Sequence, residues 1–193
     1  MAFFIAFQTA SARADVSCTT TITGTTVKGN LDVPKGSICT LNGTTVTGNV
    51  TVEGALQTCP ASIHGNLQGN HAKWLAIGCG SSVGGDVQAD HTLSFPPVPI
   101  SAFNENYLCN TTVGGNVQIQ QSLTAAPWDI GTEDECTGGP ATVAGNLQFN
   151  NNNAASDISN NIVGGDLSCQ NNVPAPTGSN DTAKQTSGQC AGF

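Results

Sequence analysis

The residues best suited to binding chemistry lie in two long intervals of an otherwise regular chain, near 94–106 and 122–139. Aromatic side chains occur there beside carboxylates, a combination that can stack on a sugar ring and accept hydrogen bonds from its hydroxyls. The same aromatic residues would equally cover the flank of a hydrophobic core, and the acidic run would more simply be a solvated loop than a calcium site. The candidate ligand-binding residues are Trp128, Tyr107, Phe103, Glu133, Asp134 and Glu135.

No group of residues is complete for a known reaction type, so we expect no catalytic residue and favour a protein that is not an enzyme. The chain has no G-x-S-x-G elbow, no phosphate-binding loop and no H-E-x-x-H helix. It also has no Cys-x-x-Cys, and His64, His71 and His91 are scattered, so we expect these histidines to be structural or surface residues and expect neither metal nor cofactor.

One phrase, V/I-x-G-N/D-L/V, recurs seven times along the chain. Its glycines are spaced by 19, 17, 20, 30, 30 and 20 residues, which is typical of a solenoid whose coils stack on one another. The glycines are Gly29, Gly48, Gly65, Gly85, Gly115, Gly145 and Gly165. Apolar residues two before and two after each glycine would face one interior if the phrase lies in a strand.

Alternating apolar and polar residues after each phrase predict short strands with one buried face, as in Val117-Gln118-Ile119. A coil of about 17 to 20 residues suits three short sides, with neighbouring coils about 4.8 Å apart. We therefore predict an all-β, single-stranded parallel β-helix of about seven coils. Right-handed winding is favoured because parallel crossovers are overwhelmingly right-handed.

The recurring positions of the phrase have structural interpretations. Glycine permits an unusual backbone conformation or a close approach that a Cβ would hinder. The next residue would either bond to nearby backbone in a turn or form an amide ladder along the axis, and the sequence leaves both open. These residues are Asn30, Asn49, Asn66, Asn116 and Asn146, with Asp86 and Asp166 in the other two phrases.

Eight cysteines in a chain with few charged residues indicate an oxidising compartment. Sequential pairing would connect adjacent coils, because each interval is about one coil long. It gives the bridges Cys18–Cys39, Cys59–Cys79, Cys109–Cys136 and Cys169–Cys190. Pairing of Cys79 with Cys109 is an alternative, because both precede a repeat glycine by six residues.

The composition and the two terminal segments of the chain indicate which domains and partners to expect. We expect residues 1–14 to be a signal peptide or its remnant, residues 15–170 the β-helix, and residues 171–193 a C-terminal cap. A net charge of −8 argues against nucleic acid, and beyond the N-terminus no apolar run is long enough to span a bilayer. Threonine ranks near Thr20 and Thr45 could form an ice-binding face, but they end after the second coil in the sequence.

The V-x-G-N-L/V phrase resembles the coils of bactofilins and of small secreted bacterial β-helix proteins of uncharacterised function, over about residues 20 to 170. The resemblance implies the β-helix but little about a role. Our first hypothesis is a secreted, non-enzymatic solenoid with a structural or adhesive role at the cell surface or in the periplasm, with an envelope component or polysaccharide as partner. The alternative is a module that binds or cleaves polysaccharide through the long intervals.

Overall fold

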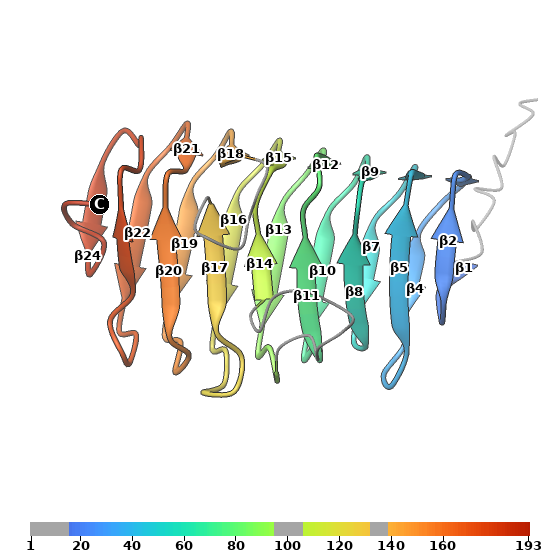
Figure 1. Cartoon of the computed structure of the whole chain (residues 1–193), viewed down its shortest axis with the longest axis horizontal. Helices are drawn as coiled ribbons and strands as arrows, with labels where there is room; N and C mark the ends of the chain where they lie inside the picture. The colour runs from blue at the N-terminus through green and yellow to red at the C-terminus, as the bar shows by residue number, and fades with distance from the viewer. Residues whose placement is uncertain (1–15, 95–105, 132–138) are drawn as a thin grey trace, which may run out of the picture.

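Three parallel β-sheets form the walls of a rod in the computed structural model, which describes residues 16–94, 106–131 and 139–193 (Figure 1). The described residues form strands, turns and bends and contain no helix. The predicted all-β parallel solenoid is therefore confirmed. Over these residues no helix is long and apolar enough for a bilayer crossing.

The three walls, here called sheets A, B and C, contain nine, eight and seven described strands. Sheet A consists of β1 (Val16–Ser17), β4 (Leu31–Val33), β7 (Val50–Val52), β10 (Leu67–Asn70), β13 (Val87–Asp90), β16 (Val117–Gln120), β19 (Leu147–Asn150), β22 (Leu167–Gln170) and β24 (Thr186–Gly188). Sheet B consists of β2 (Thr21–Thr23), β5 (Ile38–Asn42), β8 (Ala55–Thr58), β11 (Trp74–Ile77), β14 (Asn106–Leu108), β17 (Trp128–Gly131), β20 (Ser156–Ser159) and β23 (Thr177–Ser179). Sheet C consists of β3 (Thr26–Val27), β6 (Thr44–Val46), β9 (Ala61–Ile63), β12 (Ser81–Val83), β15 (Thr111–Val113), β18 (Ala141–Val143) and β21 (Ile162–Val163).

The chain visits sheets A, B and C in turn, and each set of three strands makes one coil. Every strand pairs in parallel with the equivalent strand of the next coil. Leu67 therefore aligns with Val87, and Val87 with Val117, so equivalent residues of the repeat stack in files along the rod. This alignment allows a short motif to build a continuous surface.

The V-x-G-N-L phrase forms the corner between sheets C and A, and the interpretation of the phrase as one strand was wrong. A strand of sheet C ends at its first apolar residue, as at Val83, and a strand of sheet A begins at its last, as at Val87. The predicted shared interior is nevertheless present, because both residues are about 1% exposed. The chain bends between them at Gly84-Gly85-Asp86.

Three disulfides follow the predicted sequential pairing and join neighbouring coils. Cys18–Cys39, Cys59–Cys79 and Cys169–Cys190 have Cα–Cα distances of 5.5, 4.7 and 5.3 Å. Pairing of Cys79 with Cys109 is thereby contradicted. The predicted bridge Cys109–Cys136 depends on Cys136, which lies outside the described residues. Three disulfides indicate an oxidising compartment, extracellular or periplasmic.

The C-terminal segment continues the rod and covers its last coil. Within residues 171–193, β23 pairs with β20 in sheet B and β24 pairs with β22 in sheet A. Cys190 is fully buried, and Phe193 packs against the main hydrophobic core. Such coverage protects the edge of the solenoid from pairing with another chain.

The second long interval contains a regular strand and is not a single insertion. Residues Trp128–Gly131, inside the expected insertion 122–139, form β17 and pair with β14 and β20. The additional residues of this coil are divided between the two connections on either side of β17. The expected signal segment 1–14 and most of the expected insertion 94–106 lie outside the described residues.

Candidate functional site

Sheet A carries two files of polar side chains on its outward side, together called the amide face. Along its strands, buried residues alternate with exposed or half-buried ones, so every second side chain points to solvent. The amide face is the part of these files from β10 to β22, where the first file is Gln68, Gln88, Gln118, Gln148 and Ser168, and the second is Asn70, Asp90, Gln120, Asn150 and Gln170. Most of these positions are primary amides, and none is lysine or arginine.

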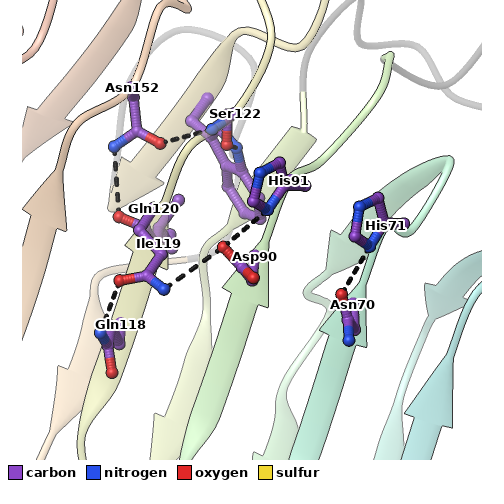
Figure 2. A network of polar contacts seen from close by, with 10 residues as sticks. Asn70, His71, Asp90, His91, Gln118, Ile119, Gln120, Ser122 and Asn152 are labelled. Atoms are coloured by element: carbon purple, nitrogen blue, oxygen red, sulfur yellow. Dashed lines mark hydrogen bonds and ion pairs between the residues drawn. The ribbon is translucent and has the colours of Figure 1, made fainter.

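Hydrogen bonds within the amide face orient several of its side chains. Gln68 Nε2 donates to Gln88 Oε1 at 3.2 Å, which joins two coils. Gln118 Nε2 donates to Gln120 Oε1 at 2.8 Å, and Gln120 Nε2 donates to Asp90 Oδ1 at 3.3 Å (Figure 2). The face therefore contains two hydrogen-bonded groups of side chains, Gln68 with Gln88 and Gln118 with Gln120 and Asp90.

One border of the amide face is a ladder formed by the Asn and Asp residues of the repeat. From Asn30 to Asn146, each side-chain Oδ1 accepts a hydrogen bond from the backbone N–H of the equivalent residue in the next coil, at 2.7 to 3.0 Å. The ladder runs through Asn30, Asn49, Asn66, Asp86, Asn116, Asn146 and Asp166. The residues connect successive coils as the predicted ladder does, but these bonds join side chain to backbone, and a side chain–side chain bond of the ladder runs from Asn116 Nδ2 to Asp86 Oδ1. Aspartate fits because only an acceptor oxygen is required.

The repeat glycine is required by this ladder. A Cβ on Gly85 would overlap Asn66 Oδ1, and one on Gly115 would overlap Asp86 Oδ1. Close approach, rather than a left-handed backbone, explains these two glycines, because their φ angles are not positive. The structure therefore selects one of the two predicted reasons for glycine at these positions.

The other border of the amide face is the corner between sheets A and B, where one residue per coil is left-handed. The φ angles there lie between 54° and 57°. The residues are His71, His91, Gln121, Asn151 and Asn171. Asn and His tolerate this conformation better than most residues, which explains part of the choice.

Two histidines stack on this border, which matches the structural or surface role expected for them. The rings of His71 and His91 have centroids 4.8 Å apart and an interplanar angle of 8°. His71 Nδ1 lies 2.6 Å from Asn70 Oδ1, and His91 Nδ1 lies 3.0 Å from Asp90 Oδ1 (Figure 2). Asp90 thereby accepts contacts from both His91 and Gln120.

A second ladder of amides lies buried beneath this border. Asn152 Oδ1 accepts from the backbone N–H of Ser122 at 2.9 Å, while Asn152 Nδ2 donates to the carbonyl of Ile119 at 3.1 Å (Figure 2). Asn172 repeats the pattern one coil later by accepting from Asn152 N and donating to Phe149 O. Sequence reasoning missed these residues, although their separation of 20 residues equals the repeat spacing.

The aromatic residues predicted to bind a ligand are inside the protein. Trp128 is fully buried in the main core, and its Nε1 donates to Ser122 Oγ at 3.0 Å. Tyr107 is 3% exposed, and burial raises the pKa of its hydroxyl, an effect that a hydrogen bond with Gln57 partly offsets. Neither ring presents a face to solvent, so both cover core as the alternative interpretation proposed. Phe103, Glu133, Asp134 and Glu135 lie outside the described residues.

Sheet C carries a file of hydroxyl groups that is longer than the threonine ranks recognised in the sequence. Strand register places these residues in line on the outward side, and Ser82 Oγ donates to Ser62 Oγ at 3.2 Å. The file is Thr26, Thr45, Ser62, Ser82, Thr112 and Thr142. Serine replaces threonine on two coils, and this substitution hid the continuity of the file.

The described carboxylates and histidines are dispersed along the rod. No three His, Cys, Asp or Glu side chains among the described residues are grouped to hold a metal ion. Asp86 and Asp90, the acids nearest the centre of sheet A, already accept hydrogen bonds or contacts from neighbouring side chains. The chemistry that the amide face offers is therefore multiple weak hydrogen bonding along an extended surface.

Comparison of the chain with family models, with curated proteins and with solved structures found no match.

Proposed function

We propose that the protein is a secreted, non-enzymatic solenoid with an adhesive role at or near the cell surface, and that the amide face of sheet A is its adhesive surface. The observation that carries this proposal is the ordered repetition of uncharged polar side chains on one wall of a disulfide-linked rod. A repeated array of hydrogen-bonding groups can hold a partner at many points without a catalytic centre.

Rigidity supports an adhesive rather than a catalytic role. The coils are joined by continuous sheets, by disulfides and by the Asn/Asp ladder, so the wall is fixed before a partner arrives. Preorganised groups lose little conformational freedom on binding, which favours affinity from individually weak contacts. The disulfides suit a protein that works outside the cytoplasm.

The alternative function uses the long intervals to bind or cleave polysaccharide. Trp128 and Tyr107 are buried and support the core, so this alternative now depends on Phe103 and the acidic run, outside the described residues. The exposed polar wall of sheet A makes the adhesive surface the better supported choice.

An adhesion assay with an activity control tests the proposal. Beads coated with the oxidised protein are expected to adhere to insoluble bacterial envelope material and to release no reducing sugar or unsaturated product from it. Beads coated with the double variant Gln88→Ala/Gln118→Ala should adhere weakly, while Thr112→Ala, on sheet C, should adhere as the wild type does. Product release by the purified protein, or unchanged adhesion of the double variant, would refute the proposed role.

A further inference from the structure

We propose that the amide face binds a neutral, hydroxyl-rich polysaccharide that lies along the rod over Gln88 and Gln118. This inference rests on the proposed adhesive function and names the chemical class of the partner. Four properties of the face carry it: its shape, its repetition, its hydrogen-bonding groups and its charge.

Two adjoining hollows mark the proposed binding position on the amide face. The first, of about 300 Å³, is lined by Gln68, Asn70, Gln88, Asp90, Gln118 and Gln120. The second, of about 180 Å³, lies toward the Asn/Asp ladder and is lined in part by Asn116, Asn146 and Gln148. Gln88 and Gln118 line both hollows, so the two depressions form one polar surface across β13 and β16.

Repetition along the axis indicates a polymeric partner. The same side chain, glutamine, occupies the first file on four successive coils, at Gln68, Gln88, Gln118 and Gln148. Paired strands are about 4.8 Å apart, so the face repeats one set of groups at short, regular intervals. A ligand that repeats its own groups along its length can use all of them, whereas a small molecule would use one or two.

The hydrogen-bonding groups at the centre suit hydroxyls. Gln88 uses Oε1 to accept from Gln68, which leaves its Nε2 as a donor. Gln118 uses Nε2 to donate to Gln120, which leaves its Oε1 as an acceptor. A sugar hydroxyl both accepts and donates, so it can pair with the donor of one glutamine and the acceptor of the other.

Charge favours a neutral polymer over an acidic one. The two files contain Asp90 and no lysine or arginine, and Asp86 lies at the edge of the second hollow. Nucleic acids and uronate polymers would meet negative charge with no cation to pair with their phosphates or carboxylates. Both aspartates are also engaged within the protein, Asp86 with Asn116 and Asp90 with Gln120, so a cationic polymer would compete with these bonds.

Affinity electrophoresis in gels that contain a soluble neutral β-glucan, a neutral mannan or polygalacturonate tests the inference. We expect at least one neutral polymer to retard the protein, polygalacturonate to have no effect, and the retardation to be insensitive to salt because no counterions are released. Gln88→Ala/Gln118→Ala should weaken binding by at least about tenfold, the effect of losing roughly 1.4 kcal/mol. Thr112→Ala on sheet C is the matched control and should bind normally.

Three outcomes would overturn the inference. They are unchanged binding by the double variant, salt-dependent binding of polygalacturonate in preference to the neutral polymers, and no binding of either neutral polymer. A wild-type dimer that the double variant abolishes in sedimentation would assign the face to a second copy of the chain. If the double variant loses adhesion to envelope material while neither neutral polymer binds the wild type, this inference fails and the adhesive function stands. If adhesion is unchanged in the double variant, both fail.

Discussion

The side chain of Asn66 accepts a hydrogen bond from the backbone N–H of Asp86 at 2.8 Å, across two coils that are 20 residues apart in sequence. The same relationship recurs at each repeat, where an oxygen of one coil satisfies a backbone donor of the next. Backbone hydrogen bonds between coils continue through the corner, as from Gly85 N to Gly65 O, but the N–H of Asp86 donates to the side chain of Asn66 instead of to a backbone carbonyl.

Asn66→Ala should lower the free energy of unfolding by about 1 kcal/mol, because the half-buried N–H of Asp86 loses its acceptor. Asn66→Asp retains the oxygen, as Asp86 does in its own coil, and should cost much less. Urea unfolding followed by circular dichroism measures both variants. Equal losses of unfolding free energy in Asn66→Ala and Asn66→Asp would show that the side-chain acceptor is not the stabilising feature of Asn66.

Gly85→Ala should destabilise the protein by about 1–3 kcal/mol, because its Cβ would overlap Asn66 Oδ1. The loss should be less than additive in the double variant Gly85→Ala/Asn66→Ala, since the second change removes the overlapping oxygen. Gly36→Ala is the control for backbone strain alone, because Gly36 has a φ of +83° and no atom near its Cβ position. Additive losses in the double variant would contradict the close-approach explanation.

The solenoid could be predicted from the sequence because its period is a property of the chain, whereas the position of each corner is not. Both apolar residues of the phrase, such as Val83 and Val87, are buried as a single strand would also require. The alternation of apolar residues therefore does not distinguish a strand from a corner that joins two strands. Only the register between coils distinguishes a single strand from a corner, and register depends on residues far apart in the sequence.

The candidate site was harder to predict because no single one of its residues is unusual in the sequence. Glutamine after a buried valine, as at Gln88, indicates only an exposed strand position. Its significance comes from alignment with Gln68 and Gln118, which are 20 and 30 residues away because the coils differ in length. Trp128 attracted attention by its type, but it begins β17 and points into the core.

Trp128→Ala should lower the free energy of unfolding by about 3–5 kcal/mol, because it leaves a cavity in the main core. Ser122→Ala, which removes only the acceptor of the Trp128 Nε1 hydrogen bond, should cost about 1–3 kcal/mol because the buried indole N–H is left without an acceptor. Val173→Ala is the exposed control and should have little effect. If Trp128→Ala abolished glycan binding while unfolding as the wild type does, Trp128 would be a ligand contact instead.

Cys169→Ser/Cys190→Ser should cost about 3 kcal/mol, the loop-closure entropy of a bridge with a sequence separation of 21 residues. The effect should concentrate at the C-terminal end, where β24 pairs only with β22. Hydrogen exchange should therefore accelerate at Thr186–Gly188 and remain slow in β7 and β10. Uniform acceleration along the rod would mean that the bridge stabilises the whole solenoid.

Asp181→Asn should stabilise the protein at pH 7 and lose this advantage in acid. Burial raises the pKa of the Asp181 carboxyl above its ordinary value of 3.8, hydrogen bonds from the backbone and side chain of Asn161 oppose the rise, and the charge of Asp157 adds to it. Because the folded pKa exceeds the unfolded one, the folded protein binds more protons. The stability of the wild type therefore falls as pH rises from below 3.8 through the folded pKa.

Asparagine keeps the Oδ1 acceptor used by Asn161 N at 2.7 Å and Asn161 Nδ2 at 2.9 Å, but it carries no charge to desolvate. The difference in unfolding free energy between variant and wild type should be positive at pH 7 and should shrink as the pH falls toward 3. Urea titrations at several pH values measure this difference, and groups that titrate equally in both proteins cancel. A difference that does not change with pH, or one that grows in acid, would show that the Asp181 carboxylate is not destabilised by burial.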